Sequence, residues 1–279
     1  PAGSSFKHDK PPVKAIVIAC NTATAYGIED IRAAIKAWGV PVFVVGVVEA
    51  GARGVQAAHR DGAVGVLATV GTCASGAYPR VIGQTLGLAG RSVPVITQQG
   101  SANLAGVIEG DPTFKESVAE RCDLDVQALM QAHQQSGAAS PLSTIVLGCT
   151  HFPLAQAEID AAFAKLRTQA EFKSLIAPKM TYVNPAEWTA RELFRTLASA
   201  RLKNTRNSAE AKDSFFISVP NPSRKDLPLT TDGGLEKAFK YSRLPGELDR
   251  EDTVNVPMTP ERIPSTTRKL IETKLPQVW

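Results

Sequence analysis

Two cysteines stand at the ends of apolar runs that are typical of buried strands. Cys20 ends the run Ala-Ile-Val-Ile-Ala, and Cys149 ends the run Thr-Ile-Val-Leu-Gly. Polar groups follow both thiols directly, and a helical pattern begins after each. These polar residues carry an amide, two hydroxyls and an imidazole: Asn21, Thr22, Thr150 and His151. Because ligands bind at the carboxyl ends of parallel strands, both thiols are expected in a ligand-binding site.

Two thiols on opposite sides of a substrate can invert a carbon stereocentre without a cofactor. One thiolate removes a proton from carbon, and the other thiol returns a proton to the opposite face. The start of a helix favours the thiolate, since unsatisfied backbone N–H groups and the helix dipole lie there. The Asn21 amide and the Thr22 hydroxyl are suitable donors for a substrate carboxylate. The sequence places Cys20 and Cys149 where an α/β sheet has its active site, which makes them candidates for such a pair.

Each of these residues also has a purely structural interpretation. Free cysteines are among the most buried residue types, so either thiol can be a packing residue. Asn21 and Thr22 can serve the following helix, with Thr22 or Thr24 as its expected cap. His151 can cap a helix that starts near Pro153. Placement at two strand ends favours the site interpretation for both thiols.

The remaining candidate residues give weaker signals. Thr72 lies in a loop expected at 69–76, where contact with substrate and a simple turn are both open. Cys73 is expected to be a bystander near the site, and Cys122 occupies a helical pattern without partners. No CxxC pair or Cys/His spacing indicates a zinc site, so we expect no metal.

Strand-like and helix-like patterns alternate from residue 13 to residue 200. This alternation predicts an α/β fold, with a parallel sheet and helices on both of its faces. Further along the chain, a strand is expected at 214–219 and a helix at 267–275. The main strand patterns cover 13–19, 41–48, 63–68, 93–97, 144–147 and 181–183.

The composition is that of an ordinary globular protein. The chain has 279 residues, four cysteines and a formal net charge of +4. So few cysteines predict a reducing, cytoplasmic compartment. No apolar run reaches the length of a membrane span, and basic residues are scattered except at 201–212, so neither a membrane nor a nucleic-acid partner is expected. Residues 1–12 are expected to form a disordered lead-in.

The two cysteine motifs resemble the signature motifs of glutamate racemases, within the aspartate/glutamate racemase superfamily. They read Ile-Val-Ile-Ala-Cys-Asn-Thr-Ala-Thr at Cys20 and Leu-Gly-Cys-Thr-His-Phe-Pro-Leu at Cys149. Further similar stretches lie at 45–52, 69–78 and 182–186. A resemblance in several ordered stretches is more specific than one motif match.

This resemblance implies an isomerase that interconverts L- and D-glutamate without a cofactor. Cys20 and Cys149 would exchange acid and base roles, and glutamate would contact the residues beside them: Asn21, Thr22, Thr150 and His151. The family also implies supply of D-glutamate for bacterial peptidoglycan, hence a role in cell-wall biogenesis and cell shape. A homodimer is a further expectation of the resemblance.

The resemblance also implies two pseudo-symmetric parallel-sheet α/β domains with the active site between them. The first domain is expected to comprise residues 1–41 and 172–205. The second is expected at residues 42–171. Residues 206–279 are expected to form a C-terminal extension without an assigned role.

The sequence departs from the family pattern before Cys20. Family members carry a strand ending in Asp-Ser-Gly ahead of the first cysteine, and residues 1–19 contain no such motif. We therefore expect either a fragment or a natively shorter relative, with an exposed sheet edge that a partner chain or the C-terminal extension covers. Asn184 also stands where the family commonly has aspartate.

Two other functions remain open. One is an aspartate racemase or another superfamily enzyme that acts on a carboxylate. The other is a non-catalytic racemase-like binding protein, which the missing Asp-Ser-Gly motif suggests. The run Gly-Cys-Thr-His-Phe-Pro-Leu favours glutamate over the first alternative.

Overall fold

The computed structural model divides the chain into two compact units, Pro1–Lys203 and Asn204–Trp279, which are described separately. The lead-in expected at 1–12 and most of the basic cluster at 201–212 lie outside the described residues. The structure describes residues 13–202, 213–231, 233–240, 242, 251–263 and 265–276.

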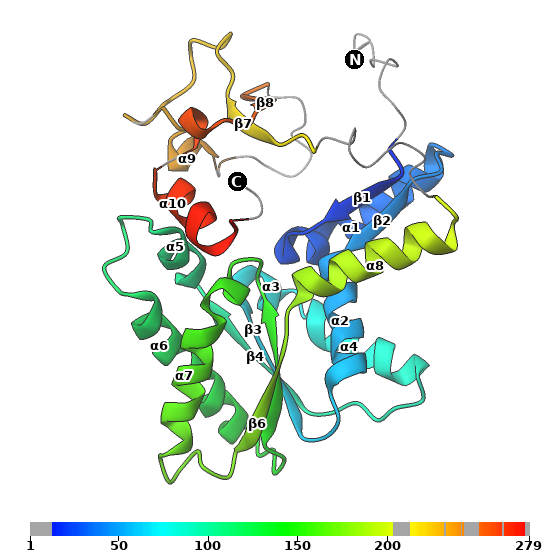
Figure 1. Cartoon of the computed structure of the whole chain (residues 1–279), viewed down its shortest axis with the longest axis vertical. Coiled ribbons are helices and arrows are strands. Elements are labelled where there is room, and N and C mark those ends of the chain that lie inside the picture. Colours follow the sequence, from blue (N-terminus) through cyan, green and yellow to red (C-terminus); the bar gives the residue numbers. More distant parts are fainter. Residues whose placement is uncertain are drawn as a thin grey trace. The chain divides into compact units, whose positions relative to one another are not determined.

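A four-stranded parallel sheet forms the centre of the first unit (Figure 1). Its order is β4 (Ile96–Ser101), β3 (Ala63–Thr69), β5 (Leu142–Gly148) and β6 (Ile176–Val183). The central strands β3 and β5 are almost entirely buried, which explains their continuous apolar sequences. The register pairs Ala68 with Gly148, so β3 and β5 end at the same level. The predicted α/β class with a parallel sheet is confirmed.

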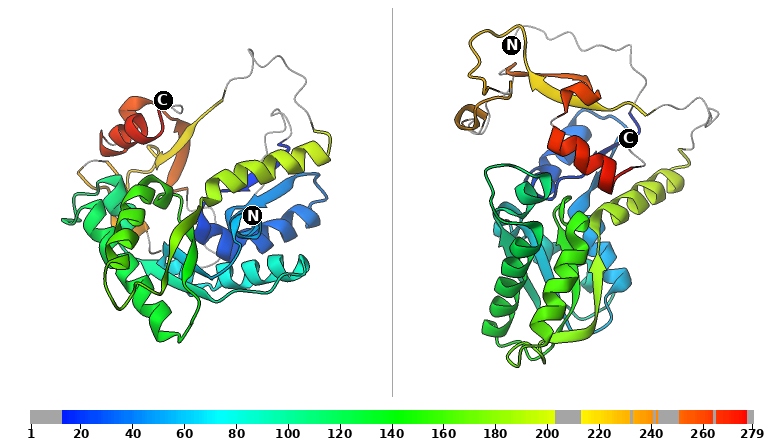
Figure 2. Two further views of the ribbon diagram at one scale, coloured as in Figure 1. Left: turned by 60° about the horizontal axis from the view of Figure 1, so that its bottom comes forward. Right: turned by 60° about the vertical axis from the view of Figure 1, so that its left-hand side comes forward.

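Helices cover both faces of this sheet (Figures 1 and 2). On one face, α6 (Val118–Gln135) contacts β3 and β4 and packs against α7 (Gln156–Arg167). On the other face, α2 (Val47–Ala58) contacts β5 and β6. It also packs against α4 (Ala77–Leu88) and α8 (Pro185–Ser199).

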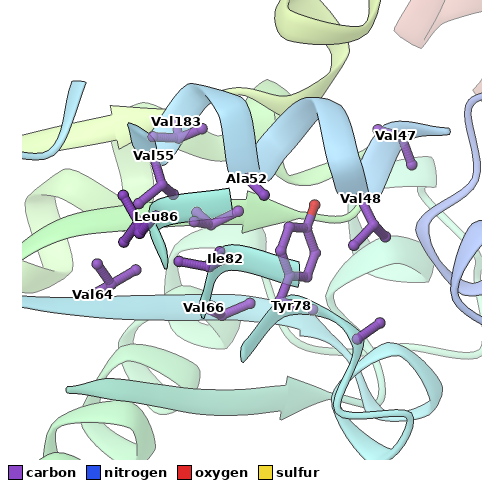
Figure 3. Close-up of a cluster of buried hydrophobic side chains, with 13 residues drawn as sticks. Val47, Val48, Ala52, Val55, Val64, Val66, Tyr78, Ile82, Leu86 and Val183 are labelled. Atoms are coloured by element: carbon purple, nitrogen blue, oxygen red, sulfur yellow. The ribbon is translucent and has the colours of Figure 1, made fainter. Parts of the chain in front are cut away.

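A buried apolar cluster fills the space between α2, α4 and the sheet (Figure 3). Tyr78 brings a hydroxyl into this cluster, and a fully buried hydroxyl requires a hydrogen-bond partner. The labelled members of the cluster are Val47, Val48, Ala52, Val55, Val64, Val66, Tyr78, Ile82, Leu86 and Val183.

A separate two-stranded parallel sheet leads to the first cysteine. It consists of β1 (Ala15–Ile18) and β2 (Phe43–Gly46), which α1 (Asn21–Ala37) connects. Among the described residues β1 pairs with β2 alone, and the exposed edge expected from the sequence stays a prediction. An apolar groove of about 900 Å³ lies beside it, lined by exposed side chains that include Trp38 and Phe43.

Some element boundaries differ from those expected. Residues 69–76 do not form a plain loop, because Thr69 caps the short helix α3 (Val70–Ala74). The strand expected at 93–97 begins later, at Ile96, because Pro94 has no N–H group for a sheet hydrogen bond. Strand β6 begins earlier than its apolar pattern indicated.

The pairing of β2 and β6 bears on the expected domain boundaries. Strand β2, which those boundaries place in the second domain, pairs with β1. Strand β6, which they place in the first domain, pairs with β5. The division into residues 1–41 with 172–205, residues 42–171 and residues 206–279 stays a prediction.

The second unit contains short elements. Strand β7 (Phe216–Pro220) pairs antiparallel with β8 (Thr253–Pro257). Two α-helices, α9 (Lys237–Lys240) and α10 (Ser265–Lys274), and the short 3-10 helix η3 (Pro260–Arg262) are also described. The strand and the final helix expected from the sequence lie within one or two residues of β7 and α10, the usual scatter of such boundaries.

We expect Gly54→Ala to destabilise the first unit by about 1–3 kcal/mol. A Cβ at Gly54 of α2 would lie 2.6 Å from Val183 Cγ1 and 2.7 Å from Trp188 Cδ1, so overpacking exceeds the gain in helix propensity. Gly27→Ala in α1 is the matched control. It meets no atom within 4 Å and should gain about 0.5–1 kcal/mol. Urea unfolding measures both variants, and stabilisation by both would contradict the prediction.

Candidate active site

Cys20 is the N-terminal cap of α1. Its backbone is extended, and its Sγ accepts a hydrogen bond from the backbone N–H of Ala23 at 3.4 Å. Helix N–H groups can stabilise negative charge on a sulfur in this position. The prediction that Thr22 or Thr24 caps the helix is wrong. The Thr24 hydroxyl instead donates to the backbone carbonyl of Ile18 at 3.0 Å.

Asn21 lies directly after the first thiol and is 4% exposed. Its Oδ1 accepts a hydrogen bond from the Tyr78 hydroxyl at 2.6 Å. Its Nδ2 is buried and has no hydrogen-bond partner within the described part of the chain. An unpaired buried N–H group costs free energy, so this nitrogen is a ready donor for a ligand.

Three threonine hydroxyls join the start of α1 to the end of β3. The Thr22 Oγ1 lies 3.0 Å from Thr69 Oγ1 and 2.9 Å from Thr72 Oγ1, and the last two lie 2.9 Å apart. Thr69 ends β3 next to the strand that leads to Cys149. These contacts bring Thr22 and Thr72, two predicted site residues, to the strand ends of the central sheet.

Cys149 directly follows β5 and is 7% exposed. Its Sγ lies 3.7 Å from Nδ1 of His151, within hydrogen-bond range for sulfur. His151 caps the short helix η1 (Phe152–Ala155), with Pro153 in its first turn, as the sequence predicted. Thr150 is exposed in the turn between them.

Glu109 was not among the residues predicted from the sequence. This residue ends α5 (Leu104–Glu109), and its Oε1 lies 2.7 Å from Nε2 of His151. Glutamate, imidazole and the Cys149 thiol thus form a continuous hydrogen-bonded chain. No motif marks Glu109, which is 42 residues from His151 in sequence.

The electrostatic environment favours a protonated His151. The hydrogen bond with Cys149 raises the pKa of His151 to about 8, and Glu109 adds to this effect, while burial acts in the opposite direction. The ring is therefore mostly protonated at neutral pH. It can donate one hydrogen bond to the sulfur and another to the carboxylate.

We expect the stability that His151 contributes to the fold to fall as pH rises from about 6.5 to above 8. A pKa raised in the folded state gives stability that is fully present below the unfolded value and lost above the folded one. The difference between wild type and His151→Asn should shrink by at most roughly 2 kcal/mol across this range. Urea unfolding of both proteins at several pH values measures this difference in the free energy of unfolding.

The comparison with His151→Asn also removes an opposing contribution. Burial lowers the pKa of His59, as does the nearby Arg91, so His59 favours folding at higher pH. Both proteins contain His59, and its effect cancels in their difference. A difference that stays constant between pH 6 and 9 would contradict the raised pKa of His151.

The other two thiols are Cys73 and Cys122. Burial raises the pKa of Cys73 to about 11 and that of Cys122 to about 12, so both remain protonated. Cys122 is fully buried in α6. Asn184 caps α8, its Oδ1 accepting from the backbone N–H of Ala186 at 3.0 Å, which an aspartate could do equally well.

The site's polar groups are thiols, hydroxyls, an amide, an imidazole and a carboxylate. In the part of the chain that the structure describes, no group of three or more His, Cys, Asp or Glu side chains is arranged to hold a metal ion.

Across the same described ranges, no helix combines the length and the apolar character needed to cross a bilayer.

Sequence comparisons identify relatives of this chain. The profile of the Asp/Glu/Hydantoin racemase family matches residues 5–175. A glutamate racemase of Limosilactobacillus fermentum is 32% identical over 184 residues, which cover 66% of this chain and 56% of that protein. A glutamate racemase of Corynebacterium kroppenstedtii is 31% identical over 238 residues, which cover 83% of this chain and 70% of that protein.

Solved structures show the same fold. The glutamate racemase isoform RacE1 of Bacillus anthracis superposes with a TM-score of 0.52 and 27% identity, over 68% of this chain and 59% of that chain. The glutamate racemase of Francisella tularensis, solved in complex with D-glutamate, gives a TM-score of 0.50 at 24% identity, over 70% of this chain and 61% of that chain. This second likeness concerns the fold alone.

The family match and the cysteine motifs agree. The matched range, residues 5–175, is more than half of the chain and contains both thiols. The chain spans 56% of the Limosilactobacillus fermentum protein and 59% of the Bacillus anthracis chain. By its sequence and its fold, this chain belongs to the Asp/Glu/hydantoin racemase family.

Proposed function

We propose that the chain is an isomerase that interconverts L- and D-glutamate through Cys20 and Cys149, without a cofactor. The observation that carries the proposal is the pair of thiols after β1 and β5, each beside groups that stabilise charge. At Cys20 these groups are the N–H groups of helix α1. At Cys149 they are His151 and Glu109, which are hydrogen-bonded in series to the thiol. Fold and family support it.

The reaction needs one proton transfer on each face of the α-carbon. One thiolate takes the α-proton, and the C–H electron pair is left on carbon beside the carboxylate. The other thiol then gives its proton to the opposite face, so the product is the enantiomer. The charges of the two sulfurs are exchanged, and the reverse reaction uses them in the opposite roles.

Nearby donors are suited to hold the substrate carboxylate. We assign this binding to Nδ2 of Asn21, which has no partner among the described residues, and to the hydroxyls of Thr22, Thr72 and Thr150. Positioned donors stabilise the negative charge that spreads onto the carboxylate as the α-proton leaves. His151 acts at Cys149, where its protonated ring stabilises the thiolate and helps it return a proton.

The test is incubation of the protein with L-glutamate in deuterated water. Incorporation of deuterium at the α-carbon and loss of optical rotation are the expected results. A parallel incubation with L-aspartate separates a glutamate racemase from an aspartate racemase. Exchange with neither amino acid would overturn the enzyme assignment and favour a non-catalytic binding protein.

The wider role follows from the same proposal. We infer that the product D-glutamate supplies bacterial peptidoglycan synthesis, and thus cell-wall biogenesis and cell shape, in the cytoplasm. A homodimer is proposed from the family resemblance. Sedimentation velocity should give twice the chain mass at micromolar concentration, and a single species of one chain mass would contradict it.

A further inference from the structure

Tyr78 lies between the segments that carry the two thiols. Its ring is fully buried in the cluster between α2, α4 and the sheet (Figure 3). A Cβ on Gly148 would lie 3.0 Å from Tyr78 Cε2, and a Cβ on Gly51 would lie 3.0 Å from Cε1. The ring is therefore fixed between α2 and the last residue of β5, directly before Cys149.

The hydroxyl of Tyr78 reaches the other thiol segment. It donates to Oδ1 of Asn21 at 2.6 Å, and Asn21 follows Cys20. Since Oδ1 accepts from the phenol, the amide group is held with Nδ2 on its other side. That nitrogen is buried and without a partner among the described residues, which marks it as a donor kept for a ligand.

The environment keeps this hydroxyl protonated. Burial raises the pKa of Tyr78 well above its ordinary value, and the nearby Cys149 and Cys73 add to the effect. The phenol therefore remains a donor over the whole working pH range. Its ring geometry and its hydrogen bond together restrict the Asn21 amide to one orientation.

We propose that Tyr78 is a positioning residue, whose hydroxyl orients the Asn21 amide so that Nδ2 faces the substrate carboxylate. This inference rests on the proposed racemase function and adds a residue to which that function gave no role. Gly51 and Gly148 support this role, because a side chain at either position would displace the Tyr78 ring.

The kinetic test is Tyr78→Phe, which keeps the ring and removes the hydroxyl. We expect the KM for L-glutamate to rise about tenfold, the loss of roughly one hydrogen bond, with kcat changed less than KM. Tyr182→Phe is the matched control, since it removes a tyrosine hydroxyl that donates a hydrogen bond to Asp160 at 2.7 Å rather than to Asn21. Its KM should equal that of the wild type.

A double variant tests whether Tyr78 acts through Asn21. If it does, Tyr78→Phe should not raise the KM further in an Asn21→Ala background. Multiplicative effects of the two substitutions would overturn the proposal. So would an unchanged KM in Tyr78→Phe while the wild type racemises glutamate.

An NMR measurement tests independently of turnover whether the Tyr78 hydroxyl orients the Asn21 amide. The Asn21 side-chain amide signals, assigned by their loss in Asn21→Ala, should shift in Tyr78→Phe and stay unchanged in Tyr182→Phe. In the wild type, the Tyr78 hydroxyl proton should exchange slowly with water. If the wild type is inactive, the proposed function fails, whereas unmoved amide signals or a rapidly exchanging hydroxyl proton would overturn the role of Tyr78.

Discussion

Cys20→Ala and Cys149→Ala should each reduce racemisation of glutamate by at least about 10³-fold. In a two-thiol mechanism, each substitution removes the proton donor or acceptor from one face of the α-carbon. The remaining thiolate can still take the proton on its own side. Each variant should therefore exchange the α-proton of one enantiomer in deuterated water, and the two variants should act on opposite enantiomers.

Cys73→Ala is the matched control for these variants. Cys73 is a free, half-buried thiol beside Thr72, and its raised pKa keeps it protonated. Racemisation should be unchanged by this substitution. Racemisation that survives in the double variant Cys20→Ala with Cys149→Ala would refute the two-thiol mechanism.

Glu109→Gln should lower kcat/KM for glutamate by about 10²-fold, near the lower end of the range for lost acid–base assistance. The carboxylate contributes to the raised pKa of His151, so its removal lowers that pKa toward the ordinary value. If protonated His151 assists Cys149, activity falls as pH rises through about 8 in the wild type. The same fall should occur at lower pH in the variant.

A pH profile of kcat/KM for both proteins measures this shift. Glu29→Gln is the matched control, because it makes the same charge change on an exposed residue that pairs with Arg32. Its profile should coincide with that of the wild type. A Glu109→Gln profile that keeps the wild-type midpoint would show that the carboxylate does not act through His151.

The sequence predicted those features that adjacent residues encode. A run of buried apolar residues indicates a strand by itself, so β3 and β5 could be recognised from local pattern. The two cysteine motifs likewise lie within single strand-to-turn segments. Their resemblance to glutamate racemases identified the family that the profile match confirms.

Other details were not accessible because they depend on contacts between distant segments. Glu109 lies 42 residues from His151, and Tyr78 lies 57 residues from Asn21. Neither residue has a local signal, since each becomes relevant only when separate helices meet at the strand ends. The threonine hydroxyl cluster depends in the same way on α1 lying against the end of β3.

The sequence by itself determined the α/β class and the family of this protein, and it singled out the two thiols as candidates, because periodicity and motifs are properties of neighbouring residues. Tertiary structure decided which groups lie against those thiols. It made Cys20 the N-terminal cap of α1 and joined Glu109 through His151 to Cys149. It also left one amide nitrogen of Asn21 without a partner among the described residues. Such contacts depend on strand register and helix packing, which bring together groups that the chain keeps far apart.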